Sequence, residues 1–283
     1  MRRRRLEALA RSRALALAPF LRTICYTVAL PHSATQQATM PLRPGVDAAR
    51  RLFDSGKLPE FRAMLARYDE CVSACTRQPK RKCCTKLPQD DEWWRTQLPG
   101  LLAEEEVEFG AAELSRLMRW KLARGKWRSL QGMVEENSDK TVRAAVAAAF
   151  GAEAADTESL RTAVQALTGP LRGVGPATAS ALLAAKMPAL APFMSDEAME
   201  GIRALGQRQY TLKHYLAFAE ALRDRAAELG ELNAEEVGRA MWVAAHVKAL
   251  GLGDAASDSA AGGSLKKRQK IAGSAEQSTA AGG

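Results

Sequence analysis

Two glycines separated by a single valine join two apolar, helix-patterned segments near the middle of the chain. The helical patterns run over residues 157–167 and 179–186, and Gly173 and Gly175 lie in the connection between them. Glycine adopts positive φ without strain and leaves the backbone exposed, so we expect both glycines in a tight turn. Pro176 suits the first position of the following helix, where its missing N–H is not needed. The spacing therefore predicts a helical hairpin.

The start of the second helix is a candidate anion site. Backbone N–H groups point outward there, with the positive end of the helix dipole behind them. The chain has a formal net charge of +9, which favours a nucleic-acid backbone as the source of the phosphate. The predicted phosphate contacts are Gly173, Val174, Gly175, Ala177 and Thr178. The alternative is a well-capped turn inside a helical core that binds nothing.

The rest of the chain predicts an all-α fold. Alanine is abundant, and neither a β-hairpin pattern nor a βαβ alternation occurs. No apolar run approaches the length of a membrane span, so we expect no membrane association. We divide the chain into a leader (1–39), an N-terminal helical extension with a Cys/Lys-rich loop (40–92), a helical domain (93–252) and a disordered basic tail (253–283).

Helix boundaries are marked by capping residues. Asn233 and Glu236 form a capping-box pattern for a helix that ends near Gly251. Thr211 is placed to cap another apolar-patterned helix, which Gly230 closes. Two further helices are expected over 111–123 and 141–150.

The two ends of the chain carry different targeting signals. Residues 1–39 hold seven arginines and a single acidic residue, as is typical of an organelle transit peptide. The alternative is that translation starts at Met40. The tail carries a basic cluster at 266–270, which indicates a nuclear localisation signal or a non-specific phosphate anchor. We predict the nucleus, with a mitochondrion or plastid as the alternative.

Four cysteines form a C-x3-C-x7-C-C cluster: Cys71, Cys75, Cys83 and Cys84. Four thiolates could hold zinc or an iron–sulfur cluster. However, two adjacent cysteines fit two corners of a tetrahedral site poorly, and no histidine lies near them. We therefore expect reduced thiols, with no metal and no other cofactor.

The segment 116–128 holds six cations interleaved with Trp120 and Trp127. Cations neutralise phosphates, and we select Arg124, Lys126 and Arg128 as DNA-facing contacts. The two indoles lie seven residues apart, on one face if the segment is helical, which predicts that both pack into the core. The alternative is that an indole stacks on an extruded base.

Ser195 and Asp196 follow a short apolar loop. Ser195 is placed as an N-cap, and an acid in the first helical turn is favourable. That interpretation explains both residues without any function. As a carboxylate at a helix start, Asp196 is also a candidate for chemistry at a sugar.

The pattern Leu-x-Gly-Val-Gly-x-Ala-Thr-Ala resembles the hairpin of the helix-hairpin-helix DNA glycosylases. In that superfamily the catalytic aspartate follows the hairpin by about twenty residues and opens the next helix. Asp196 stands twenty-one positions after Gly175 and fits that place. The resemblance implies a glycosylase-like helical domain, duplex DNA as the partner, and a role for Asp196 at the sugar.

A wider set of motifs spans 68–246. These are Arg-Trp-Lys-Leu-x-Arg-Gly-Lys-Trp-Arg, Gly-Val-Gly-Pro-Ala-Thr-Ala-Ser, Phe-x-Ser-Asp-Glu and Tyr-Thr-Leu-Lys-x-Tyr. In combination they resemble an uncharacterised eukaryotic family related to those glycosylases, which implies the fold and DNA association but carries no activity of its own.

Two departures from the superfamily limit what is implied. Bifunctional members have a nucleophilic lysine where this chain has Ala177, so Schiff-base chemistry at that position is not supported. The residues around Asp196 also differ from the usual Val-Asp-Thr-His. We therefore predict a DNA-binding, glycosylase-like protein; if it is an enzyme, it is a monofunctional DNA glycosylase that uses water in base excision repair. The alternatives are a non-catalytic DNA-binding module or a helical protein-interaction scaffold.

Overall fold

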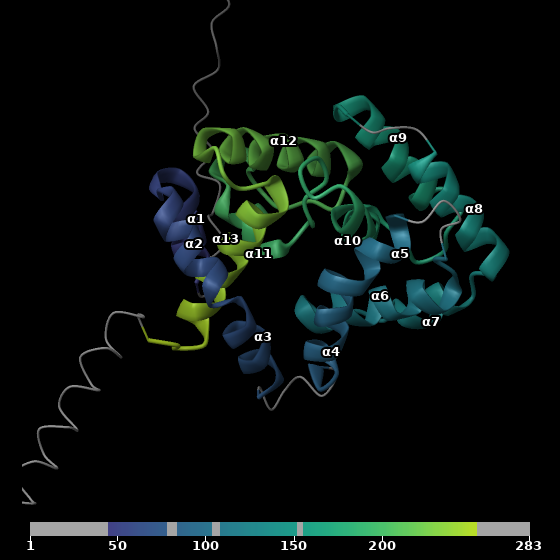
Figure 1. Cartoon of the computed structure of the whole chain (residues 1–283), viewed down its shortest axis with the longest axis horizontal. Helices are drawn as coiled ribbons and strands as arrows, with labels where there is room; N and C mark the ends of the chain where they lie inside the picture. Colours follow the sequence, from purple (N-terminus) through teal and green to yellow (C-terminus); the bar gives the residue numbers. More distant parts are fainter. Residues whose placement is uncertain (1–44, 78–83, 104–107, 152–154, 254–283) are drawn as a thin grey trace, which may run out of the picture. The chain divides into compact units, whose positions relative to one another are not determined.

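A computed structural model of the chain describes residues 45–77, 84–103, 108–151 and 155–253 (Figure 1). Every regular element in these ranges is helical, which confirms the all-α prediction for the part that is described. The leader, the basic cluster at 266–270 and Cys83 lie outside these ranges.

The first half of the described chain contains six elements. They are α1 (Val46–Ser55), α2 (Leu58–Ala66), α3 (Tyr68–Thr76), α4 (Leu87–Glu92), the π-helical segment η2 (Trp93–Gln97) and α5 (Leu98–Ala103). Because α4, η2 and α5 follow one another directly, the chain continues as helix across the 92/93 boundary that we drew between extension and domain.

The second half begins with α6 (Ala111–Arg124), α7 (Gln131–Glu135), α8 (Asp139–Phe150), α9 (Thr157–Thr168) and α10 (Pro176–Lys186). It continues with α11 (Asp196–Gly201), the 3-10 turn η3 (Arg203–Leu205), α12 (Leu212–Leu229) and α13 (Ala234–Ala249).

The predicted caps are present in the structure. The Asn233 side chain accepts from the Glu236 N–H and the Glu236 carboxylate accepts from the Asn233 N–H, which completes the capping box of α13. The Thr211 hydroxyl accepts from the His214 N–H at the start of α12. Gly230, with φ +78°, ends that helix in the left-handed conformation.

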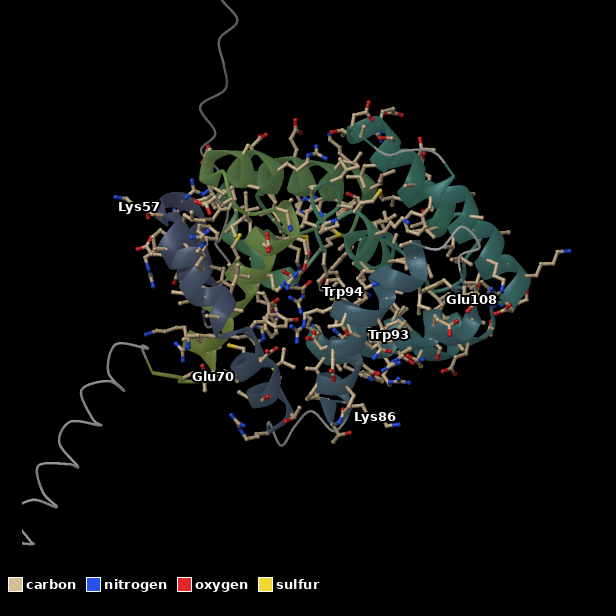
Figure 2. The ribbon with its side chains drawn as sticks, viewed as in Figure 1. Lys57, Glu70, Lys86, Trp93, Trp94 and Glu108 are labelled. Carbon is tan, nitrogen blue, oxygen red and sulfur yellow. The ribbon has the colours of Figure 1, made fainter. Side chains whose placement is uncertain are left out.

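Helix α10 lies among α5, α6, α9 and α12 (Figure 1). Its alanines are buried and allow these neighbours to approach closely. Trp94 of η2, labelled in Figure 2, donates its Nε1–H to the Ala181 carbonyl at 2.8 Å and stacks on Trp120 of α6 at 4.3 Å. The hairpin helix is therefore fixed from several sides, so the turn in front of it has a rigid base.

A second set of contacts surrounds α13, which packs against α1, α2, α3, α11 and α12. The buried apolar residues of these helices and of those around α10 form one core. The N-terminal extension and the helical domain thus share a single core in the described chain.

The described cysteines are buried in this core. Burial raises the pKa of Cys71 to about 12, and the Cys84 thiol donates to the Ala123 carbonyl at 3.3 Å. No group of His, Cys, Asp or Glu side chains in the described ranges is arranged to hold a metal ion. Because Cys83 lies outside these ranges, our expectation for the four-cysteine cluster stays a prediction. None of the described helices has the length and apolar character needed to cross a membrane.

Candidate functional site

The turn between α9 and α10 depends on one left-handed glycine. Gly173 has φ +74°, as predicted. A Cβ atom placed there would lie 3.0 Å from Val134 Cγ2 and 3.1 Å from Met133 Cβ, so a side chain would also be crowded. On either side, Leu171 and Val174 are buried and anchor the turn in the core.

Asn137, just before α8, holds the turn through its side-chain amide. Its Nδ2 donates to the Arg172 carbonyl at 2.9 Å, and its Oδ1 accepts from the Arg172 N–H at 2.9 Å. The same Nδ2 also donates to the Val134 carbonyl at 2.8 Å. The hairpin conformation is therefore fixed by a partner 35 residues away in sequence.

Gly175 differs from the prediction. Its φ of −105° and ψ of −177° are extended values that any residue adopts, so the expected positive φ is wrong at this position. Gly175 is instead the N-cap of α10, and a Cβ atom there would meet nothing within 4 Å. The absence of a side chain at Gly175 leaves open space in front of the helix start.

The N–H groups of the turn are not equivalent. In the described residues, the N–H groups of Gly173, Gly175 and Ala177 have no backbone acceptor. The Thr178 N–H donates back to the Gly175 carbonyl at 2.9 Å, and the Val174 N–H donates more weakly to the Leu171 carbonyl at 3.4 Å. Three of the five predicted phosphate contacts therefore have an N–H group without a backbone acceptor, and those of Gly175 and Ala177 stand at the start of α10.

Asp196 opens α11 after a loop that is fixed at both ends. In this loop the Phe193 N–H donates to Glu235 Oε2 at 2.7 Å and the Met194 N–H donates to Ser180 Oγ at 3.0 Å. Ser195 is the N-cap, as predicted, and accepts from the Ala198 N–H. The position of Asp196 is thus set jointly by α10 and α13.

The carboxylate of Asp196 lies among cations and a phenol. The Tyr210 hydroxyl donates to Oδ1 at 2.6 Å, and Arg208 Nη1 lies 3.5 Å from Oδ2. Arg128 donates from Nη2 to the Tyr210 hydroxyl at 3.3 Å and places its guanidinium 5.1 Å from the ring centroid. Burial and the hydrogen bond to Asp196 raise the pKa of Tyr210. A chain of contacts therefore joins Arg128 to Asp196.

Arg124 is not a surface residue, and our expectation that it faces DNA with Lys126 and Arg128 is wrong in this respect. Arg124 is the last residue of α6. It is 2% exposed because its side chain points into the core. Its Nε donates to the Tyr68 hydroxyl at 3.3 Å, and its guanidinium lies 4.5 Å from the ring centroid of Trp242. Lys126 and Arg128, beyond the helix end, are exposed.

The two tryptophans of this segment also separate. Trp120 is fully buried, which confirms the prediction for that residue. Trp127 is 61% exposed, which contradicts it. The reason is the end of α6 at Arg124: with Gly125 as the C-cap, Trp127 no longer continues the helical face of Trp120.

The predicted hairpin, carboxylate and cations meet at one cavity of about 240 Å³. The exposed lining residues, here called the rim, are Lys126, Arg128, Gly175 and Tyr210. Four of the buried lining residues, here called the buried wall, are Arg124, Phe193, Met194 and Trp242. The remaining lining residues include Lys121, Gly173, Ala177, Thr178 and Asp196. Val174 is absent from this lining because its side chain packs into the core.

Lys121 is a cavity residue that the sequence analysis passed over within the cationic segment. Burial lowers its pKa to about 8, and the charge of Arg128 acts in the same direction while that of Asp196 opposes it. A negative charge that enters the cavity would favour the ammonium form and raise the pKa of Lys121 again. Tyr210 and Arg208 were also missed as site residues; the Tyr-Thr-Leu-Lys-x-Tyr motif that contains Tyr210 was the available signal.

We compared the chain with family models, with curated proteins and with solved structures. None of them matches it.

Proposed function

We propose that this chain is a DNA-binding protein with a helix-hairpin-helix, glycosylase-like fold. One observation carries the proposal: open N–H donors, exposed cations and a helix-opening carboxylate line the same cavity. Duplex DNA supplies a phosphate for the donors and cations, and a sugar within reach of the carboxylate.

The hairpin binds one backbone phosphate. The N–H groups of Gly175 and Ala177 stand at the start of α10, where the helix dipole favours an anion. Lys126 and Arg128 add positive charge at the rim, and the open space at Gly175 permits close approach of the phosphate oxygens. These contacts are independent of base sequence.

Asp196 stabilises positive charge that develops on the sugar when a base leaves. Its ion-pairing and hydrogen-bonding partners keep a carboxylate favourable at this position, which suits an oxocarbenium-like centre. Because Ala177 occupies the lysine position of bifunctional glycosylases, water is the nucleophile in this proposal and the DNA strand stays intact.

A second candidate function is DNA binding without catalysis. It is favoured by the same two contacts, since a carboxylate already paired with Arg208 and Tyr210 must compete with them to reach a sugar. The proposed nucleus as location belongs to both candidates.

The binding proposal is tested with a charge placed in the open space at the turn. Gly175→Asp keeps a favoured N-cap residue, so we expect the fold to persist while the carboxylate repels a phosphate. Gly100→Asp is the matched control, because it adds the same charge at an open, exposed helical position outside the cavity.

Binding of a short duplex is followed by fluorescence anisotropy at several salt concentrations. We expect affinity that falls with salt, a loss of roughly tenfold or more in Gly175→Asp, and little change in Gly100→Asp. Equal affinities of the two variants would refute the phosphate site.

Catalysis is tested by abasic-site formation on duplexes with single damaged bases, in wild type and Asp196→Asn. Loss of activity with retained binding supports the glycosylase, and inactivity of the wild type on every duplex supports the non-catalytic candidate. Borohydride treatment during the reaction tests the nucleophile. Trapping of a protein–DNA adduct would overturn water as the nucleophile and assign that role to an amine, with Lys121 and Lys126 as the lysines that line the cavity.

A further inference from the structure

The buried wall of the cavity contains two hydrogen-bond donors that the protein does not use. Arg124 Nη1 and Trp242 Nε1 are both inaccessible to solvent, and neither finds an acceptor in the described part of the chain. Buried donors are nearly always paired, so each of these two unpaired donors marks a place where an acceptor is missing.

The surroundings of Arg124 hold its charge and satisfy its Nε–H, which donates to the Tyr68 hydroxyl, but leave Nη1 without an acceptor. Its guanidinium lies 4.5 Å from the ring centroid of Trp242, 5.0 Å from that of Phe193, and 5.8 Å from that of Tyr68. None of the carboxylates in the described ranges forms a salt bridge with Arg124. Aromatic faces attract a cation, but they do not accept conventional hydrogen bonds from the N–H groups in the guanidinium plane. The rings therefore hold the guanidinium in place while Nη1 can still donate a hydrogen bond to a ligand.

The shape and chemistry of this wall suit a planar aromatic ligand. Phe193 and Trp242 supply ring surface, Met194 adds a polarisable apolar contact, and both unpaired donors belong to residues that line the same cavity. A free phosphate would use the donors but leave the apolar surface in contact with a charged ion. The phosphate-compatible N–H groups lie instead at the hairpin.

We propose that the buried wall binds the carbonyl-bearing edge of a nucleobase turned out of the duplex, with Arg124 and Trp242 as the donors to its oxygens. This inference rests on the proposed function, because the rim must hold the backbone from which the base is extruded.

The donors select a class of base. Guanidinium and indole groups donate and cannot accept, so they pair with carbonyl oxygens and oppose exocyclic amino groups. Uracil and hypoxanthine carry a carbonyl where cytosine and adenine carry an amino group. The wall is therefore selective for the deaminated members of these two pairs.

The test compares four duplexes that differ only in one base. Uracil, cytosine, hypoxanthine or adenine is placed opposite a tetrahydrofuran abasic analogue, so that none of the four bases is held by a partner. A 2′-fluoroarabino sugar on the tested nucleotide disfavours an oxocarbenium ion and keeps the base attached during the measurement. Affinity is measured by fluorescence anisotropy, with inorganic phosphate as a competitor in a parallel series.

Three variants assign the effect to the wall. Trp242→Phe removes the N–H and retains an aromatic ring, and Arg124→Met removes the guanidinium. Tyr215→Phe is the control, because its hydroxyl is also buried and unpaired but does not line the cavity. Circular dichroism verifies that each variant is folded, and Trp242→Phe keeps the inference testable if Arg124→Met is not.

We expect uracil and hypoxanthine to bind about tenfold tighter than cytosine and adenine. The affinity ratio between the carbonyl-bearing and the amino-bearing bases should fall in Trp242→Phe, reach about one in Arg124→Met and stay unchanged in Tyr215→Phe. Equal binding of all four bases in the wild type overturns the inference, while salt-dependent binding that Gly175→Asp weakens still supports the proposed function. Equal binding of the bases together with competition by phosphate that Arg124→Met abolishes would assign the wall to an anion instead. Absence of duplex binding overturns both proposals.

Discussion

The same small substitution should destabilise the protein at one glycine of the hairpin and leave its stability nearly unchanged at the other. In Gly173→Ala the added methyl group occupies a residue with φ +74° and lies 3.0 Å from Val134 Cγ2, 3.1 Å from Met133 Cβ and 3.2 Å from Val134 N. The left-handed conformation alone costs an alanine roughly 1–2 kcal/mol. The close contacts add to that cost, so we expect the free energy of unfolding to fall by about 2–3 kcal/mol.

Gly175→Ala should be nearly neutral. The added methyl group meets nothing within 4 Å and the backbone is extended. Alanine is a poorer N-cap than glycine by about 0.5 kcal/mol, but it restricts the unfolded chain by a similar amount. Urea denaturation followed by circular dichroism measures both variants. A loss at Gly175 as large as that at Gly173 would show that the turn is not held by the left-handed residue.

Three further predictions concern groups that touch the hairpin or the cavity. Asn137→Ala removes both hydrogen bonds to the Arg172 backbone and should lower the free energy of unfolding by about 2 kcal/mol. The Arg172 amide should also exchange its hydrogen faster; an unchanged exchange rate would show that Asn137 does not hold the turn. Because the folded chain lowers the pKa of Lys121 from 10.5 to about 8, the unfolded chain binds the proton more tightly, so this residue makes the protein more stable as pH rises from about 8 to 10.5. The difference in unfolding free energy between wild type and Lys121→Met, measured across that range, should show this rise; a flat difference would refute it. Asp196→Asn should move the pKa of Tyr210 back toward its ordinary value. NMR titration of labelled tyrosine measures this pKa, and an unchanged value would mean that burial alone raises it.

Local signals in the sequence predict the helices well. Asn233, Thr211 and Ser195 cap helices through their own side chains, and such bonds depend on residues two or three positions away. Gly173 was also predictable, because a tight turn between helices usually requires one left-handed residue. Gly175 was not, since the same residue type serves at an N-cap in an ordinary extended conformation.

The same distinction between local and tertiary signals applies to the site residues. The number of positions between Gly175 and Asp196 can be counted in the sequence. The contacts of Asn137 and Tyr210, in contrast, join segments that only tertiary packing brings together. Trp127 was misplaced because one glycine, Gly125, ends α6 within an apparently continuous amphipathic pattern. Arg124 was misplaced for another reason: it lies inside α6, four residues after the buried Trp120 and on the same face, but its charge suggested exposure. After that end the helical period no longer predicts which side chains are buried.

The exposure of Trp127 gives the protein an optical property that its other indoles lack. Of the five tryptophans in the chain, four are buried and Trp127 is exposed. Indole emission shifts to longer wavelength in water, so the native spectrum should contain a blue component from the core and a red one from Trp127. Iodide should quench the red component selectively, since Lys126 and Arg128 on either side attract the anion. A ligand that covers the rim without reaching Trp242 would shield that component and leave the blue one unchanged, which separates binding at the rim from a change in the fold.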